Sequence, residues 1–320
     1  MKGMKIIVMF PGQGCQYVGM CKHLIAQFRK VKQIFDTAND VLGFNLLSMV
    51  LEGNMKDLMQ GQNAHPAVVT ASYALFAAFV ELTGTKPICA VGHSLGEISA
   101  LIAANAISFE NGVRFVLKRG EIMHSVASEK RGCVGIVMDV EIGVLQDIVY
   151  ETSKKEYVSI TGYNSPKQFL VAGTVAAMRE LEKKVSEANG EYIPFKMIPM
   201  KEDAPYHCDL MSGVVPGIRE EVGKLYFREP EFEILSTVTG EIIQHAEDIP
   251  ELLVKQLSMP VLWNQVMDKV VCLQPDCLID IGPQQIMRNL VSENERVPQA
   301  FSFDDDSDRV KITDILCTRR

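Results

Sequence analysis

The stretch ICAVGHSLG, residues 88–96, sets a serine between two glycines directly after a short apolar run. The G-x-S-x-G pattern usually lies where a buried strand turns sharply into a helix. The glycines let the backbone make this turn, and the following helix points free amides and its positive dipole end toward the turn. The stretch therefore predicts a nucleophilic Ser94 on an α/β sheet, with a plain glycine-rich turn as the alternative.

The segments around this turn alternate between apolar strand patterns and helix patterns. Strands that alternate with helices favour a parallel sheet with crossover helices. The expected strands are 6–10, 88–91, 232–238 and 277–281, and the expected helices are 67–82, 95–104 and 110–126.

Residues 129–198 follow a different order, β-α-β-β-α-β, which is the ferredoxin-like arrangement. We therefore predict an α/β fold made of a large α/β-hydrolase-like domain with a parallel sheet, residues 1–128 and 199–320, and a small inserted ferredoxin-like subdomain, residues 129–198. A cleft between two such lobes is a common place for a small-molecule site. The strands expected in the subdomain are 134–140, 157–163, 168–173 and 192–197, and its helices are 142–152 and 175–188.

The composition, with 47% apolar and 22% charged residues, is that of an ordinary globular protein. A net charge of −8 argues against nucleic acid or an anionic membrane surface as the main partner, and no apolar run of about 18 residues predicts a membrane span. Eight cysteines without a C-x-x-C pair indicate buried, reduced thiols. We expect a cytoplasmic monomer without metal or cofactor. The acidic run at 304–308 begins either a solvated tail or a terminal helix.

A serine nucleophile needs a base, and the chain has six histidines. His93 is adjacent to Ser94, but successive positions on a tight turn point apart. His23 and His245 lie among charged residues and are expected to be exposed. His207 lies in a stretch without clear periodicity, and such loops often carry catalytic residues. His207 is therefore a candidate base, and an ordinary loop histidine is the alternative.

Seven short motifs follow one another along the chain: FPGQG at 10–14, GHSLGE at 92–97, KRG at 118–120, NSP at 164–166, PYHC at 205–208, QL at 256–257 and DIGP at 280–283. In this order they resemble the malonyl-CoA:acyl carrier protein transacylases, which include fatty-acid synthesis enzymes and polyketide synthase acyltransferases. The resemblance extends from residue 5 to about residue 295. It implies that the chain moves a malonyl group from malonyl-CoA to the phosphopantetheine thiol of an acyl carrier protein.

The resemblance also assigns the reacting groups. Ser94 would attack the thioester and hold the acyl group as an ester. His207 would accept the serine proton and return it to the departing thiol, oriented by a backbone carbonyl rather than by an aspartate. The backbone amides of Gln13 and Leu95 would form the oxyanion hole.

Arg119 is the residue that indicates the kind of acyl group in the substrate. A guanidinium can hold a carboxylate with two parallel charge-assisted hydrogen bonds, and a malonyl group carries a free carboxylate whereas an acetyl group does not. Without the resemblance, an ordinary exposed helix position would be the preferred interpretation of Arg119. By the resemblance, the other substrate-binding residues are Gln256, Asn164, Tyr206 and Ile98, with Gln256 supporting His207 or the acyl group.

Three residues, Cys15, Ile98 and Tyr206, depart from the commonest pattern of the family. Ile98 and Tyr206 would border the acyl pocket, which slightly favours a freestanding polyketide-type enzyme. One alternative is a hydrolase of the same fold that removes acyl groups from carrier proteins, since the same residues would serve and only water access would differ. A non-enzymatic carrier-binding module is a second alternative, which the intact Ser94, His207 and Arg119 disfavour.

Overall fold

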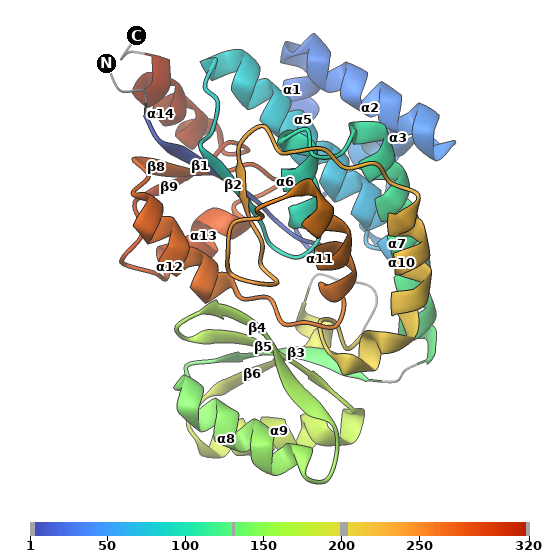
Figure 1. The fold of residues 1–320 in the computed structure, drawn as a ribbon, viewed down its shortest axis with the longest axis vertical. Coiled ribbons are helices and arrows are strands. Elements are labelled where there is room, and N and C mark those ends of the chain that lie inside the picture. The colour runs from blue at the N-terminus through green and yellow to red at the C-terminus, as the bar shows by residue number, and fades with distance from the viewer. Residues whose placement is uncertain (1–3, 130–131, 199–203, 318–320) are drawn as a thin grey trace.

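The computed structural model describes residues 4–129, 132–198 and 204–317. The fold is mixed α/β with one parallel and one antiparallel sheet, as predicted (Figure 1). The parallel sheet has the strand order β7-β2-β1-β8-β9. Its strands are β1 (Ile6–Phe10), β2 (Cys89–Gly92), β7 (Glu233–Leu235), β8 (Cys277–Asp280) and β9 (Ala300–Ser302).

Strand β1 lies in the middle of this sheet, and all five of its side chains are buried. Successive side chains of a strand point to opposite faces. Ile6, Val8 and Phe10 accordingly join one apolar core, whereas Ile7 and Met9 join a second core on the other face. A strand that is buried on both faces reads as a continuous apolar run, which is why the pattern IIVMF was recognisable.

Helix α5 (Gly61–Thr83) runs through the larger core and packs against α2 (Arg29–Leu42), α6 (Gly96–Ala103) and α7 (Phe109–Glu129). The helix begins at Gly61 and includes Pro66, whereas the sequence pattern predicts a start at residue 67. By length and composition α5 could cross a membrane, yet 72% of its most apolar window is buried inside the protein. Its apolar character is therefore accounted for by its central position.

The antiparallel sheet has the order β4-β5-β3-β6, which confirms the ferredoxin-like arrangement. Helices α8 (Ile142–Ser153) and α9 (Val175–Glu187) cover the face that lies away from the larger sheet (Figure 1). The predicted strand at 192–197 is too long, because β6 ends at Pro194, which has no amide to continue the ladder, and a 3₁₀ turn follows. The elements are β3 (Cys133–Met138), α8 (Ile142–Ser153), β4 (Val158–Ser165), β5 (Gln168–Gly173), α9 (Val175–Glu187) and β6 (Glu191–Pro194).

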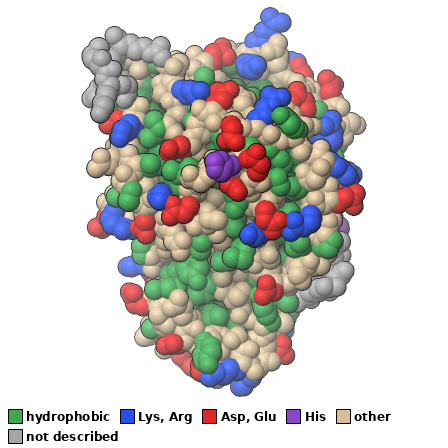
Figure 2. All heavy atoms as spheres, in the orientation of Figure 1, with side chains coloured by type: hydrophobic (Ala, Val, Ile, Leu, Met, Phe, Trp, Pro, Cys, Tyr) green, Lys and Arg blue, Asp and Glu red, His purple; other side chains and the backbone are tan. Residues whose placement is uncertain are grey.

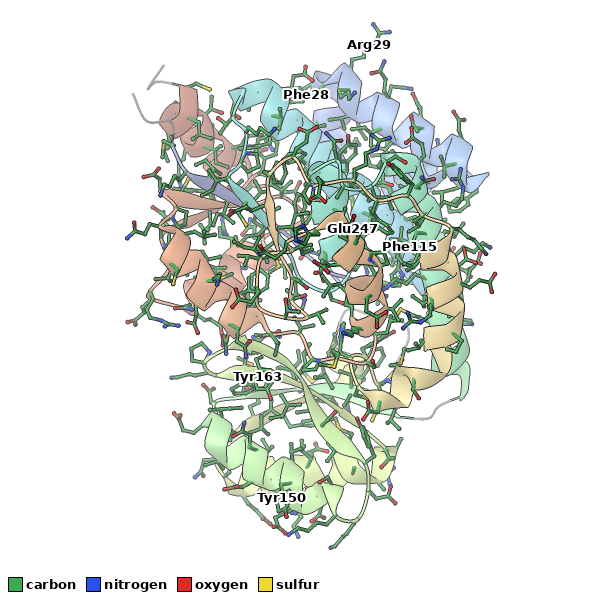
Figure 3. The ribbon with its side chains drawn as sticks, viewed as in Figure 1. Phe28, Arg29, Phe115, Tyr150, Tyr163 and Glu247 are labelled. Carbon is green, nitrogen blue, oxygen red and sulfur yellow. The ribbon has the colours of Figure 1, made fainter. Side chains whose placement is uncertain are left out.

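Strand β4 joins the small sheet to the rest of the molecule. The Tyr163 amide donates to the Val261 carbonyl at 2.9 Å, and the Val261 amide donates to the Thr161 carbonyl at 2.9 Å. The Tyr163 side chain, labelled in Figure 3, packs edge-on against Phe169 in the apolar core of the small sheet. Both predicted domain boundaries adjoin stretches outside the described residues, and the division into 1–128 with 199–320 and 129–198 remains our proposal.

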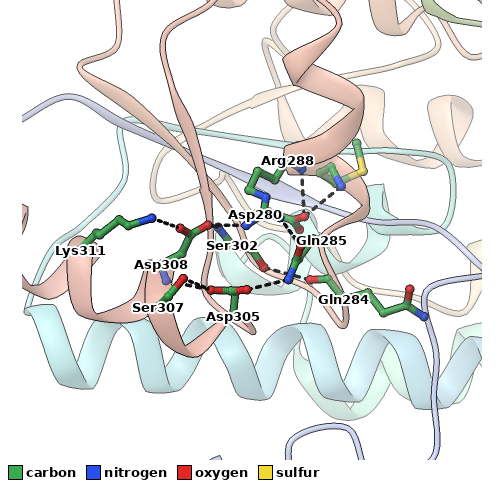
Figure 4. Close-up of polar contacts among 10 residues, drawn as sticks. Asp280, Gln284, Gln285, Arg288, Ser302, Asp305, Ser307, Asp308 and Lys311 are labelled. Carbon is green, nitrogen blue, oxygen red and sulfur yellow. Dashed lines mark hydrogen bonds and ion pairs between the residues drawn. The ribbon is translucent and has the colours of Figure 1, made fainter.

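The acidic run at 304–308 begins a terminal helix, α14 (Asp306–Cys317). The Asp308 carboxylate is buried and accepts from Arg288 at 2.7 Å and from the Ser302 amide at 3.0 Å (Figure 4). Asp280, at the end of β8, accepts the amide of Arg288 at 3.0 Å. This network attaches α14 to the edge of the parallel sheet, so the acidic run is packed rather than part of a solvated tail.

The remaining helices cover the sheet and its connections. They are α1 (Lys22–Gln27), α3 (Leu46–Glu52), α4 (Met55–Leu58), α10 (Val215–Gly223), α11 (Ile249–Lys255), α12 (Trp263–Leu273) and α13 (Ile286–Ser292). Acidic and basic side chains are mixed over the face shown in Figure 2. All eight cysteines are free thiols, five of them buried.

Candidate active site

Ser94 lies on the turn between β2 and α6, as the sequence predicted, with a left-handed backbone at φ 51°. The two glycines of the motif are required by close backbone contacts. A Cβ atom on Gly92 would lie 2.1 Å from the backbone of Gly96, and one on Gly96 would lie 2.1 Å from the Phe10 carbonyl oxygen. The turn is therefore pressed against the end of β1, and the serine stands at its apex.

Substituting Gly96→Ala is expected to destabilise the protein, because the added methyl group would meet backbone rather than a movable side chain. Overpacking of this kind costs about 1–3 kcal/mol or more. The free energy of unfolding, measured in urea, should fall by at least that amount. A Gly143→Ala variant is a matched control, since a Cβ atom there has open space around it. Equal stability of the two variants would show that the turn is loosely packed.

The Ser94 hydroxyl and the His207 ring are in direct contact. Ser94 Oγ lies 2.8 Å from His207 Nε2, and His207 Nδ1 lies 2.7 Å from the Gln256 main-chain oxygen. The carbonyl can only accept, so Nδ1 carries the proton and the lone pair of Nε2 faces the serine. Burial lowers the pKa of His207 to about 4, and the nearby charge of Arg119 acts in the same direction. The histidine is thus neutral and able to accept a proton at neutral pH.

A cavity of about 100 Å³ opens beside this pair. Ser94, His207, Arg119 and Tyr206 contribute to its wall from the larger unit. Side chains of the small sheet complete it, among them Val134, Thr161 and Leu170. The site therefore lies between the two sheets, where the two-lobed organisation had placed it.

Gln13 and Leu95 also line the cavity. The loop that carries Gln13 approaches the serine turn closely, since a Cβ atom on Gly12 would lie 2.8 Å from the His93 carbonyl oxygen. Leu95 precedes the first residue of α6, so its amide lies at the positive end of that helix. Among the described residues, neither backbone amide has a hydrogen-bond acceptor. Two free amides beside the serine provide the arrangement needed to bind an oxyanion.

Arg119 is only 3% exposed, so the interpretation as an ordinary exposed helix position is wrong. Its neighbour Lys118 is exposed and pairs with Glu121 at 2.7 Å. Arg119 Nη2 instead donates to Gln256 Oε1 at 3.4 Å, and no carboxylate among the described residues pairs with the guanidinium. Burial lowers its pKa to about 10, which leaves it positively charged at neutral pH. A buried cation beside the cavity therefore lacks an anionic partner.

Three of the expected substrate-binding residues lie outside the cavity wall. Asn164 Oδ1 accepts from His93 Nε2 at 2.9 Å, behind the serine turn. Ile98 lies on α6 in the apolar core and faces α7 near Gly112. Gln256 lies behind Arg119 and His207 and contacts both.

Two buried polar residues near the site were not singled out from the sequence. His65 Nε2 lies 3.0 Å from Gln13 Oε1, and burial lowers the pKa of His65 well below its usual value. Glu97 Oε2 accepts from Gln256 Nε2 at 2.6 Å. Each is a lone titratable group in an apolar stretch of helix, around 65–72 for His65 and in GEISALIA for Glu97. That isolation is the signal that could have identified them.

The acyl transferase domain family matches residues 7–301, and the chain belongs to this family. A curated relative named malonyl CoA-acyl carrier protein transacylase, from Bacillus subtilis, is 31% identical over 302 residues, which cover 94% of each chain. A relative of the same name from Escherichia coli K12 is 29% identical over 281 residues, covering 88% of this chain and 90% of the relative.

Solved structures of other proteins have the same fold as this chain. The crystal structure of FabD from Acinetobacter baumannii aligns with a TM-score of 0.92 and 27% identity over 100% of both chains. A second structure shows a type II polyketide synthase acyl carrier protein in complex with its malonyl-transacylase. It aligns with a TM-score of 0.91 and 28% identity, over 97% of this chain and 99% of that one.

Proposed function

We propose that the chain is a malonyl-CoA:acyl carrier protein transacylase, which transfers a malonyl group to the phosphopantetheine thiol of the carrier through an ester on Ser94. The observation that carries this proposal is the placement of three groups on one cavity. The Ser94–His207 pair and the buried Arg119, which has no carboxylate partner in the described part of the chain, all face the same space of about 100 Å³. The names of the relatives and of the similar structures support the same activity.

The first half-reaction loads the serine. Ser94 Oγ attacks the thioester carbonyl carbon while its proton passes to His207 Nε2. The carbonyl oxygen becomes an oxyanion, which the amides of Gln13 and Leu95 bind. When the carbon–sulfur bond breaks, the coenzyme A sulfur takes the proton from His207 and leaves. In the second half-reaction the carrier thiol attacks the ester by the same steps in reverse order.

Arg119 would select the acyl group. A malonyl carboxylate within the cavity would give the buried guanidinium the anion that the described residues do not supply. Charge-assisted, two-pronged pairs of this kind are among the stronger hydrogen bonds in proteins. An acetyl group would instead leave the cation unpaired. We therefore propose malonyl-CoA rather than acetyl-CoA as the donor.

The hydrolase alternative gains no support from these relatives, which are named transacylases. We further propose that the protein works in the cytoplasm, because free thiols fit a reducing compartment. A monomer is proposed as well, since one chain supplies every group of the site. The carrier would serve fatty-acid or polyketide synthesis.

The test of this function is the fate of the malonyl group. The enzyme is mixed with malonyl-CoA in the presence and absence of a phosphopantetheinylated carrier protein, and malonyl-carrier and free malonate are both measured. We expect rapid malonyl-carrier formation and slow malonate release. Malonate release that outpaces transfer would support the hydrolase, and the absence of both products would overturn the proposal.

The pH dependence of acylation should reflect the lowered pKa of His207. Neutral imidazole is the active form, and burial holds the pKa near 4, so the base is present well below the usual histidine value of about 6.5. We expect kcat/KM for acylation to remain level as the pH falls through 6.5 and to decline only in more acidic solution. The measurement is made with acetyl-CoA, so that binding of a malonyl carboxylate does not contribute. A half-maximal rate near pH 6.5 would contradict the assignment.

A further inference from the structure

The Gln256 side chain connects the serine turn, a buried carboxylate and the guanidinium that faces the cavity. Its Nε2 donates to the Ser94 main-chain oxygen at 3.0 Å and to Glu97 Oε2 at 2.6 Å. Its Oε1 accepts from Arg119 Nη2 at 3.4 Å. Every polar atom of this amide is therefore engaged.

The chemistry of the three partners fixes which way the amide points. The Ser94 carbonyl only accepts hydrogen bonds and the Arg119 guanidinium only donates them, while Glu97 accepts in its ionised form. The NH₂ group must accordingly face Glu97 and Ser94, and the carbonyl oxygen must face Arg119. In the reverse orientation, two donors would face each other at Arg119 and two acceptors would face each other at Glu97.

Glu97 is buried, and its contacts with Gln256 and Thr237 are both made by Oε2, whereas Oε1 has no hydrogen-bond partner among the described residues. It lies in the first turn of α6, is 1% exposed, and accepts from the Thr237 hydroxyl at 3.4 Å as well as from Gln256. Burial raises its pKa to about 7, while hydrogen bonds from Ser236, Gln256 and Thr237 act in the opposite direction. The Glu97 carboxylate is buried and does not line the cavity. Its role is therefore exerted through a neighbouring residue.

We propose that Glu97 is a positioning residue for malonyl selectivity: it holds the Gln256 amide with its oxygen toward Arg119, and so holds Arg119 in the pose that binds the malonyl carboxylate. This inference rests on the proposed function and deepens it. Glu97 makes the shorter of the two contacts of the Gln256 NH₂ group, 2.6 Å against 3.0 Å to the Ser94 main-chain oxygen. By holding the Gln256 amide, Glu97 maintains the 3.4 Å hydrogen bond from Arg119 Nη2 to Gln256 Oε1.

The test compares two substitutions of Glu97 by the ratio of kcat/KM for malonyl-CoA to that for acetyl-CoA. Glu97→Met keeps the length of the side chain and removes one of the two acceptors of the Gln256 NH₂ group, so only the Ser94 main-chain oxygen still opposes rotation of the amide. We expect the ratio to fall about tenfold, as for the loss of one charge-assisted hydrogen bond. Glu97→Gln retains a carbonyl acceptor for Gln256 and should stay within about threefold of the wild type.

The same substitution in an Arg119→Ala background shows whether the effect passes through Arg119. There Glu97→Met should leave the ratio unchanged, because the group that it positions is gone. Thermal unfolding is followed in parallel. If Glu97→Met does not fold, Gln256→Met carries the test, since it removes the link from the other side and should lower the ratio by a similar factor, again only when Arg119 is present.

Three results would overturn the proposal. An equal loss with malonyl-CoA and acetyl-CoA would show that Glu97 is merely structural. A ratio that still falls in the Arg119→Ala background would show that it acts elsewhere, and a full loss in Glu97→Gln would show that the acceptor is not what matters. Failure of the proposed function looks different, because the wild type itself would then show no malonyl transfer.

Discussion

The Arg119→Ala variant is expected to lose malonyl transfer by about a hundredfold or more while its acetyl transfer falls little or even rises. The substitution removes a charge-assisted, two-pronged contact from a buried site, which typically costs a few kcal/mol. The acetyl group makes no such contact and no longer meets an unpaired buried cation. The measurement is the ratio of kcat/KM for malonyl-CoA to that for acetyl-CoA in the two proteins.

Arg119→Lys is the matched control for this experiment. It keeps the positive charge but replaces the planar fork by a single ammonium group, so it should rescue malonyl transfer only in part. A malonyl-to-acetyl ratio that is the same in the wild type and the alanine variant would mean that Arg119 is structural. The enzyme would then be better described as a broader acyltransferase or as the carrier-trimming hydrolase.

Ser94→Ala is expected to abolish formation of the acyl-enzyme and leave the fold intact. Alanine and serine both carry a Cβ atom, so each adopts the left-handed conformation at φ 51° at a similar cost. The substitution removes only the hydroxyl that contacts His207. Intact-protein mass spectrometry after mixing with malonyl-CoA should show one added malonyl group on the wild type and none on the variant. Matching unfolding curves provide the control, and a variant that still gains the malonyl mass would remove Ser94 as the nucleophile.

The serine turn and the order of the small subdomain could be predicted from the sequence because both are local patterns. The motif at 92–96 specifies its own turn through glycines that meet backbone, and the strands at 133–138 and 168–173 are short apolar runs between clear turns. Element ends were less predictable. Helix α5 continues through Pro66, and β6 stops at Pro194, where the lost amide outweighs the apolar pattern beyond it.

The surroundings of the site depend on contacts between distant segments, which no local pattern encodes. Arg119 belongs to the KRG motif and Ile98 directly follows GHSLGE, and both lie on helices, yet Ile98 packs into the core and Arg119 faces the cavity. The link from Glu97 to Gln256 spans 159 residues of sequence, and that between His65 and Gln13 spans 52. Only the folded chain brings these polar groups together.

The most direct test of the central claim is the discharge of isolated malonyl-enzyme. Wild-type protein is loaded with malonyl-CoA, freed of excess donor and mixed with phosphopantetheinylated carrier protein or with buffer alone, and the masses of both proteins are followed with time. We predict one malonyl group on the enzyme, located on Ser94, that moves to the carrier and is lost only slowly in buffer. Loss to water at the same rate with and without the carrier, or a malonyl group on another residue, would contradict the account.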